Sequence, residues 1–150
     1  MDGIYARRSD YLDRHVQLGI ASQRLISVSF PQTPDEDASD DHPLLDRIFA
    51  YLEGVEDDFS DVEIGLTVPT RHRNVLERVR EIPYGEQVSV RDLAAITPDF
   101  DPENDDDLDD VRTALAENPL PLVIPDHRVR DGPSNAPPEI EQKLRAIEDL

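Results

Sequence analysis

The sequence of 150 residues contains no cysteine, which excludes disulfide bonds and thiolate ligands for a metal. No stretch of about eighteen apolar residues occurs, and the first residues lack the basic-then-apolar pattern of a signal peptide. The four histidines are scattered without the spacing of zinc ligands. We therefore expect a cytoplasmic protein with no membrane partner, no bound metal and no other cofactor.

Positive charge is also scarce, because 15 basic residues face 34 acidic ones and the net charge is -19. Aspartate outnumbers glutamate, arginine outnumbers lysine, and Lys143 is the only lysine. This composition is typical of a protein from a salt-rich cytoplasm, so we expect a halophilic source. A hydrophobic content of 37% in periodic segments argues against disorder.

A net negative charge of this magnitude repels nucleic acid, since contacts with phosphates supply most of the non-specific affinity. In roughly molar salt, however, the Debye length falls to about 3 Å, and only close contacts between charges then matter. The net charge alone therefore does not exclude a DNA ligand.

Apolar periodicity organises the first part of the chain. Residues 16–20 and 26–30 alternate apolar with polar or small side chains, which predicts a hairpin with one buried face. The apolar side chains of residues 44–52 fall on one helical face, and a glycine ends that helix. Residues 62–68 show a second period-two pattern and predict another strand. Residues 1–69 are thus expected to form a small α/β lobe.

Helix signals dominate the rest of the chain. Four helices are predicted: one capped by Thr70 with core positions up to Ile82, one starting at a capping box of Ser89 and Asp92, one that buries Leu108, Val111 and Leu115 and ends near Asn118, and one from Pro138 that buries Ile140, Leu144 and Ile147. Two short helices joined by a loop and followed by an extended segment suit a winged helix-turn-helix domain. We expect this domain to span residues 70–150.

Three prolines within residues 118–130 hold the chain extended and exclude helix interior. Residues 122–124, Leu-Val-Ile, predict a short buried strand or a segment that crosses the core. The triplet 126–128, Asp-His-Arg, follows directly and is set at the edge of that core, where titratable groups are most perturbed. That placement suggests a functional site. The alternative is a solvated turn with a local ion pair.

Four motifs carry a resemblance to a known family. They are His42-Pro43-Leu44-Leu45-Asp46, Ile82-Pro83-Tyr84-Gly85-Glu86 followed by Val88-Ser89 and Leu93-Ala94-Ala95, Asn118-Pro119-Leu120-Pro121, and Pro125-Asp126-His127-Arg128-Val129. In order and content they resemble the alkylguanine-DNA alkyltransferase family, suicide repair proteins that take an alkyl group from the 6-oxygen of guanine. The resemblance covers essentially the whole chain and is most specific over residues 70–130. It implies an α/β (α+β) fold, with a ribonuclease H-like lobe before a winged helix-turn-helix domain that grips the minor groove.

The departure from the family falls on the reactive atom, because Asp126 occupies the position of the acceptor cysteine. A carboxylate is a weaker nucleophile toward an alkyl carbon than a thiolate and would give a labile ester, so suicide thiol transfer is excluded. The chain is similar to the alkyltransferase-like proteins, a related subgroup without the cysteine. Members bind the lesion and hand it to excision repair. The resemblance therefore predicts a DNA repair protein whose partners are DNA with alkylated guanine and excision-repair proteins.

The resemblance also assigns the other two candidate catalytic residues. His127 matches the histidine that draws the proton from the acceptor thiol through a water, and Glu148 aligns with the glutamate that orients it. A histidine flanked by two acids is expected to favour its protonated form and to donate to a flipped base. The alternative is structural: His127, Arg128 and Glu148 would lock the last helix to the loop before it.

The candidate DNA-contacting positions are mostly altered. Asp109 falls where the family places the arginine that enters the duplex, and an anion there opposes phosphate contact. Arg112, one turn later, is either a partial substitute or an ordinary surface arginine. Val90 stands where the family has a tyrosine that presses on the target phosphate, and valine lacks the hydrogen bond. Its neighbour Arg91 remains a candidate contact.

Two further members of the DNA-binding set match the family, Asn118 and Arg128, although Asn118 is equally expected as a helix cap. The family loop that walls the base pocket is longer than residues 131–137 here, so we expect the pocket wall to be missing. The acidic tract 105–110 lacks the glycine and glutamate of an EF-hand and is interpreted as a solvated face rather than a cation site.

Two alternative functions remain open. In the first, the chain keeps the fold but has abandoned DNA and acts as a protein-interaction module through residues 97–117. In the second, Asp126 and His127 activate water or form a transient ester on a flipped base. Enzymatic activity is thus left undecided, with non-enzymatic binding to alkylated DNA as the leading prediction.

Overall fold

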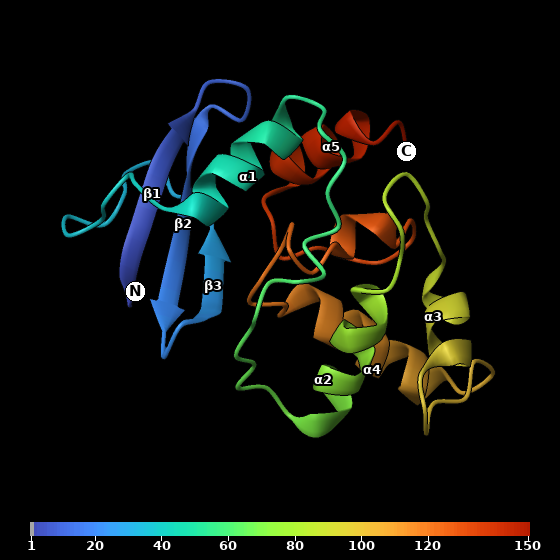
Figure 1. Ribbon diagram of the computed structural model, residues 1–150. Helices are drawn as coiled ribbons and strands as arrows, with labels where there is room; N and C mark the ends of the chain where they lie inside the picture. Colours follow the sequence, from blue (N-terminus) through green and yellow to red (C-terminus); the bar gives the residue numbers. More distant parts are fainter. Residues whose placement is uncertain (1) are drawn as a thin grey trace.

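The computed structural model describes residues 2–150 and has two lobes that lie side by side (Figure 1). The N-terminal lobe holds a three-stranded sheet and one helix: β1 Gly3–Ser9, β2 Arg14–Ala21, β3 Arg24–Ser29 and α1 Pro43–Leu52. The C-terminal lobe is helical: α2 Thr70–Val79, α3 Val90–Ile96, α4 Asp105–Ala116, the 3-10 turn η1 Asp126–Arg128 and α5 Pro138–Ile147. The predicted α+β class is therefore confirmed.

The sheet is antiparallel in the order β1-β2-β3, and a turn at Ser22 and Gln23 joins β2 to β3. Both turn residues have positive φ, 53° and 64°, which matches the twist of a two-residue hairpin. The predicted hairpin is confirmed, but a register shift between Gly19 and Ile20 breaks the simple alternation. Ile26 is consequently exposed, and its predicted place on the buried face is wrong.

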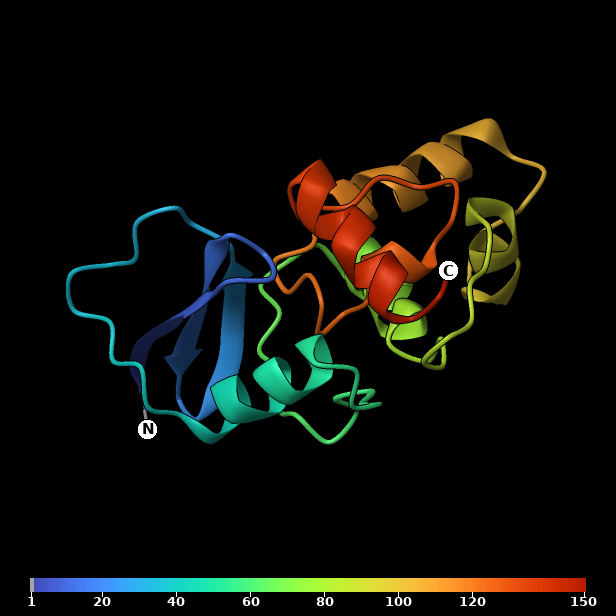
Figure 2. The same ribbon diagram turned by 90° about the horizontal axis from the view of Figure 1, so that it is seen from above.

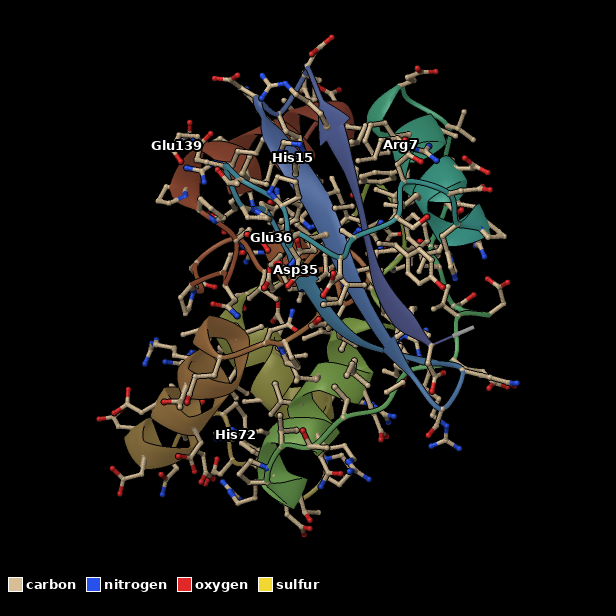
Figure 3. The ribbon with its side chains drawn as sticks, turned by 90° about the vertical axis from the view of Figure 1, so that its left-hand side faces the viewer. Arg7, His15, Asp35, Glu36, His72 and Glu139 are labelled. Atoms are coloured by element: carbon tan, nitrogen blue, oxygen red, sulfur yellow. The ribbon has the colours of Figure 1, made fainter. Side chains whose placement is uncertain are left out.

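Strand β1 does not follow the alternation of buried and exposed residues that marks a half-buried strand. Its neighbours Tyr5 and Ala6 are both buried. It pairs with β2 along its whole length. Arg7 of β1 reaches α1, where it binds Asp46 at 3.0 Å and lies 5.1 Å from the ring centre of Phe49. Figure 3 shows this arginine between the sheet and the helix.

Helix α1 follows the predicted apolar stripe. His42 Nδ1 accepts the Leu44 N–H at 3.0 Å and caps the helix, while Pro43 takes the first helical position. The helix ends before Gly54, whose φ of 104° is readily adopted only by glycine. Its buried face also contains Tyr51, which brings a phenol hydroxyl into the protein interior.

The segment 62–68 is extended, but it is not the predicted strand. One isolated parallel bridge joins Ile64 to Leu25. The Leu25 N–H donates to the Glu63 carbonyl and the Gly65 N–H donates to the Leu25 carbonyl, both at 2.9 Å. The apolar side chains of the segment are only partly buried, because it covers the edge of β3 at one point and then leaves.

Helices α2, α3 and α4 pack on one another, and Figure 2 shows α3 on the side of their lobe that faces away from the sheet, with α4 running from there toward the middle of the lobe. Helix α2 lacks the predicted threonine cap: Thr70 is already helical, and Pro69 before it offers no side-chain acceptor. The capping box of α3 is confirmed, since Ser89 and Asp92 exchange hydrogen bonds of 2.9 and 3.2 Å. Asn104 caps α4.

Residues 118–125 cross the core between the lobes, as predicted, in a tight turn rather than a strand. The Ile124 N–H donates to the Leu120 carbonyl at 2.7 Å. The Val28 N–H of β3 donates to the Pro119 carbonyl at 3.0 Å, which ties the crossing to the sheet. Within residues 2–150, no helix has the length and apolar character needed to cross a bilayer.

Candidate functional site

The triplet of η1 is the centre of the candidate site. Asp126 and His127 have no exposed surface, and Arg128 is 2% exposed. Because the core-crossing segment delivers them directly into the interior, the alternative of a solvated turn is wrong. Charged and polar groups buried in this way need internal partners.

Glu148, which ends α5, supplies most of those partners. One carboxylate oxygen, Oε1, accepts from Arg128 Nε at 2.7 Å and from the Gly85 N–H at 3.0 Å. The other, Oε2, accepts from His127 Nε2 at 2.6 Å, from Arg128 at 3.2 Å and from the Tyr51 hydroxyl. Burial opposes ionisation, yet the hydrogen bonds from His127 and Arg128 lower the pKa of Glu148 to about 2. Glu148 is therefore ionised and fully engaged.

Tyr51 is a member of this site that sequence analysis does not identify. It comes from α1 of the other lobe, and its hydroxyl also lies 3.3 Å from His127 Nε2. Burial, with the nearby Glu148 carboxylate, raises its pKa above the usual range for tyrosine. The available signal was a tyrosine on the apolar stripe of a helix, since a buried tyrosine hydroxyl usually has a polar partner.

Only one of the two ring nitrogens of His127 has a hydrogen-bond partner in the described residues. Its carbonyl accepts from Arg145 at 2.7 Å and its Nε2 contacts Glu148, while Nδ1 is buried without a partner in the described part of the chain. Burial lowers the pKa of His127, although the hydrogen bond to Glu148 acts in the opposite direction. This direction is opposite to the expected preference for the protonated histidine. Because Glu148 is ionised and its oxygen can only accept, His127 Nε2 donates to it.

Asp126 points to a different set of partners. Its Oδ1 accepts from the Ser134 hydroxyl at 2.6 Å, and its Oδ2 accepts from Asn118 Nδ2 at 3.0 Å and from the Asn135 N–H at 3.2 Å. Burial raises the pKa of Asp126 to about 7 despite these three hydrogen bonds. No hydrogen bond joins Asp126 to His127 in residues 2–150, so the two catalytic candidates do not form an acid–base pair in this structure.

The short loop after η1 closes over Asp126. Ser134 and Asn135 contact the carboxylate directly, and Asn135 Nδ2 also donates to the Asn118 carbonyl at 2.6 Å. Short as it is, this loop therefore covers the Asp126 carboxylate. Neither Ser134 nor Asn135 carried a sequence signal, because a serine and an asparagine in a proline-rich loop are ordinary turn residues.

Arg128 and Asn118, both predicted DNA contacts, are occupied internally. Besides Glu148, the Arg128 guanidinium binds the Ile82 carbonyl at 2.7 Å and Asp58 at 3.2 Å. Asn118 is fully buried, and its side chain joins the Asp126 set described above. Its predicted alternative role as the cap of α4 is also wrong, because Glu117 holds that position. In this conformation neither side chain faces a solvent-borne ligand.

The remaining predicted DNA contacts separate into one buried and three exposed residues. Val90 is 1% exposed, and its N–H donates to Asp131 at 2.7 Å. Arg91, Asp109 and Arg112 lie on the surface of α3 and α4. Arg112, the predicted partial substitute for the family arginine, binds Asp109 at 2.9 Å, and this ion pair neutralises its charge.

The exposed acidic face of α4 is partly neutralised from α2. Arg71 binds Asp107 at 3.0 Å and Asp110 at 3.1 Å, with its guanidinium 4.0 Å from the ring centre of Phe100. The acidic tract is thus tied into the surface of the lobe. Within residues 2–150, no group of three or more histidine, aspartate or glutamate side chains has the arrangement of a metal site. Figure 3 shows His72 on α2, far from His15 on the sheet.

The sequence pattern described as "6-O-methylguanine DNA methyltransferase, DNA binding domain" matches residues 70–146, which is more than half of the chain. The chain belongs to this methyltransferase family. The methylated-DNA–protein-cysteine methyltransferase of Methanopyrus kandleri is 35% identical over 109 residues, which are 71% of this chain and 78% of that protein. The corresponding protein of Metallosphaera sedula is 28% identical over 110 residues, 71% of this chain and 66% of that protein.

The fold is that of methyltransferases of known structure. The Mycobacterium tuberculosis OGT in complex with DNA superposes with a TM-score of 0.73, at 21% identity, over 98% of this chain and 91% of that chain. The methyltransferase of Pyrococcus kodakaraensis KOD1 gives a TM-score of 0.70 at 21% identity, over 98% of each chain. Within this family the present chain has no cysteine at any of its 150 positions, so transfer to a cysteine thiol is impossible.

Proposed function

We propose that this protein is an alkyltransferase-like DNA repair protein that binds alkylated or distorted DNA without alkyl transfer. The supporting observation is the state of Asp126. At the position that the family resemblance gives to the acceptor cysteine, the chain holds a buried carboxylate with three hydrogen-bond donors. A carboxylate whose oxygens accept three hydrogen bonds is a poor nucleophile. The neighbouring His127–Glu148 pair of the family resemblance is nevertheless retained.

The loop of residues 131–137, which covers Asp126, limits the ways in which such a protein can recognise damage. A flipped base needs an open pocket, and Ser134 and Asn135 cover Asp126. Recognition in this conformation therefore relies on the deformability of the damaged duplex, read by the surface of α3 and α4. Binding is followed by transfer of the lesion to excision-repair proteins, since the chain has no nucleophile that completes the repair.

The acidic surface sets the conditions for this binding. The net charge of -19 opposes association with DNA at low salt, and screening at high salt removes most of that opposition. A salt-rich cytoplasm is the setting that we propose. Affinity then depends little on further salt, because few phosphates are neutralised by the exposed arginines of α3 and α4.

Fluorescence anisotropy tests the proposal, with one duplex that contains an O6-methylguanine and its unmodified twin, in about 2 M potassium chloride. We expect the lesion duplex to bind more tightly. Arg91→Gln on α3 is expected to weaken binding of both duplexes. Arg8→Gln is the matched control, since both arginines are exposed and ion-paired but Arg8 lies on the sheet. Equal binding of the two duplexes, or no binding, would overturn the proposal.

A second candidate function is supported by one specific observation, the ion pair between Arg112 and Asp109. It leaves the exposed face of α4 without an unpaired cation for phosphate and favours a protein-interaction module that does not bind DNA. Its contacts would lie within residues 97–117. A protein partner whose affinity is unchanged by Asp109→Arg would argue against this candidate.

A further inference from the structure

The cations of this protein are distributed unevenly between paired and unpaired positions. Nine of the 15 basic side chains lie within 4.0 Å of a carboxylate. Within residues 2–150, six have no such ion pair, and three of these six line one groove: Arg24, Arg73 and Arg80. In a chain with 34 acidic residues, three unpaired guanidinium groups at one place are unexpected.

The groove lies where the two lobes meet. Arg24 and Ile26 come from β3, the floor comes from residues 64–67, and Arg73 and Arg80 come from α2. Figure 1 shows the segment that leads into α2, which includes residues 64–67, passing between the start of β3 and α2. The groove has a volume of about 420 Å³, which lies in the usual range for small-molecule sites.

Two of the three arginines are fixed by backbone carbonyls rather than by ion pairs. Arg80 donates to the Phe59 and Val62 carbonyls at 2.9 Å, and Arg73 donates to the Leu66 carbonyl at 2.7 Å. The Nε of Arg80 is buried without a partner in the described residues. Burial lowers the pKa of Arg80, although the Asp61 and Glu77 carboxylates act in the opposite direction.

Arg24, the third arginine, is not fixed in this way. Its side chain is exposed and has no hydrogen bond or ion pair within residues 2–150, so all of its donors are available to a ligand. Glu77 also lines the groove, but it forms no ion pair with any of the three arginines. The charged side chains that line the groove therefore sum to a positive charge, in contrast to the chain as a whole.

The floor of the groove is apolar. Ile26 is 41% exposed there, and Ile64 and Leu66 are partly buried beside it. Gly65 keeps the floor low, because a Cβ at this position would lie 3.3 Å from Ile26 Cγ2 and 3.7 Å from Arg24 Cβ. A ligand that fits has one strongly anionic end for the guanidinium groups and one apolar end for the isoleucines.

We propose that this groove binds a small phosphorylated molecule with an apolar body, of the size of a mononucleotide. Guanidinium groups bind phosphate oxygens through paired, charge-assisted hydrogen bonds, and Arg24, Arg73 and Arg80 approach the groove from both lobes. The bound molecule would therefore bridge the sheet and α2. This site is separate from Asp126 and from the exposed surface of α3 and α4, and it does not depend on DNA binding.

Isothermal titration calorimetry on the full chain tests the proposal, with ADP and inorganic pyrophosphate as probes. We expect saturable binding of both, with ADP the tighter because pyrophosphate leaves the apolar floor uncovered. Arg24→Gln is expected to weaken ADP binding about tenfold, the usual effect of losing one charge-assisted contact. Arg8→Gln, an exposed arginine outside the groove, is the control and should bind ADP like the unsubstituted protein.

Gly65→Leu gives an independent test, because it fills the groove and keeps every charge. Its φ is not in the left-handed region, so the substitution adds no backbone strain. Circular dichroism confirms that the variant is folded before titration, and loss of ADP binding is then expected. Absence of saturable binding to the unsubstituted protein, equal affinity of Arg24→Gln and Arg8→Gln, or binding of duplex DNA but not of ADP at the groove would each overturn the proposal.

Discussion

The buried centre around Glu148 keeps the residues that the family resemblance expects, whereas the exposed surface of α4 departs from it. At the centre, Glu148 has partners on both carboxylate oxygens, including His127 and Arg128. On α4, Asp109 stands where the family resemblance places a cation and takes Arg112 as its partner. His127 and Arg128 thereby make a structural connection between η1 and the end of α5. In the proposed function, the exposed surface of α3 and α4 contacts the DNA.

Physical cost explains the difference. Removing one partner from a buried ionic network leaves the other charges unpaired and costs several kcal/mol, so such a network changes as a unit or not at all. An exposed ion pair contributes about 0–1 kcal/mol and is replaced freely. Substitutions at the centre should therefore alter stability, and substitutions on α4 should alter binding.

The largest effect is expected for Glu148→Gln. It leaves the Arg128 guanidinium buried without a carboxylate partner on α5, and we expect unfolding free energy to fall by about 3–5 kcal/mol in urea denaturation. Glu139→Gln is the matched control, because Figure 3 shows Glu139 at the surface of the same helix. Its effect should stay below about 0.5 kcal/mol. Equal stability of the two variants would contradict the structural connection.

The next effect is a pH dependence that arises from Asp126. Burial raises its pKa to about 7, so the folded protein holds the proton more tightly than the unfolded chain. The resulting stabilisation is complete below the unfolded pKa and is lost as pH rises through about 7. We expect the free energy of unfolding to fall by about 2 kcal/mol between about pH 5 and about pH 7, as measured by urea denaturation at each pH.

Asp126→Asn isolates that contribution. The asparagine Nδ2 fits opposite the Ser134 hydroxyl, and its carbonyl oxygen accepts from Asn118 and Asn135 in place of Oδ2. The pH-dependent loss should therefore disappear in this variant. An unchanged slope would show that Asp126 does not carry it. Glu148, with its pKa of about 2, acts in the opposite sense, because its stabilisation is lost only as pH falls through about 2.

A smaller effect is expected at the contact between the lobes. Tyr51→Phe removes the hydroxyl that donates to Glu148 and should cost about 1–2 kcal/mol, measured by thermal denaturation. Tyr11→Phe provides the comparison, since the Tyr11 hydroxyl is exposed and binds the Lys143 carbonyl at 3.2 Å. Its effect should be close to zero. A larger loss in Tyr11→Phe would reverse the ranking of buried and exposed contacts.

The smallest change in stability is expected on α4. Asp109→Arg breaks an exposed ion pair, and the unfolding free energy should change by no more than about 0.5 kcal/mol. Duplex affinity at low salt should nevertheless rise about tenfold, with a steeper salt dependence, because an anion is replaced by a phosphate-binding cation. Anisotropy titrations at several salt concentrations measure both quantities. Unchanged affinity would place the DNA surface elsewhere.

The parts of the fold with a regular local pattern were predictable from sequence. Helix α1 follows its apolar stripe, and the capping box at Ser89 fixes the start of α3 because the signal is local and reciprocal. Strand β1 and residues 62–68 were not predicted correctly. In β1, adjacent Tyr5 and Ala6 are both buried, and alternation in 62–68 reflects packing against one edge rather than a paired strand.

The candidate site was predictable only where a motif or a buried run marked it. Asp126, His127 and Glu148 were identified in this way, but the direction of the His127 pKa depends on burial that no sequence pattern reports. Tyr51 lies 76 residues before His127 along the chain, and the two meet through folding of separate lobes. Ser134 was missed because a loop serine gives no sign of the carboxylate that it will contact.

Intact-protein mass spectrometry and fluorescence anisotropy on the same sample, incubated with a duplex that contains O6-methylguanine, test the central claim most directly. The proposed function predicts tighter binding to this duplex than to its unmodified twin, with no increase in protein mass and with the methyl group still on the DNA. A methylated protein, a demethylated duplex, or equal binding to both duplexes would contradict it.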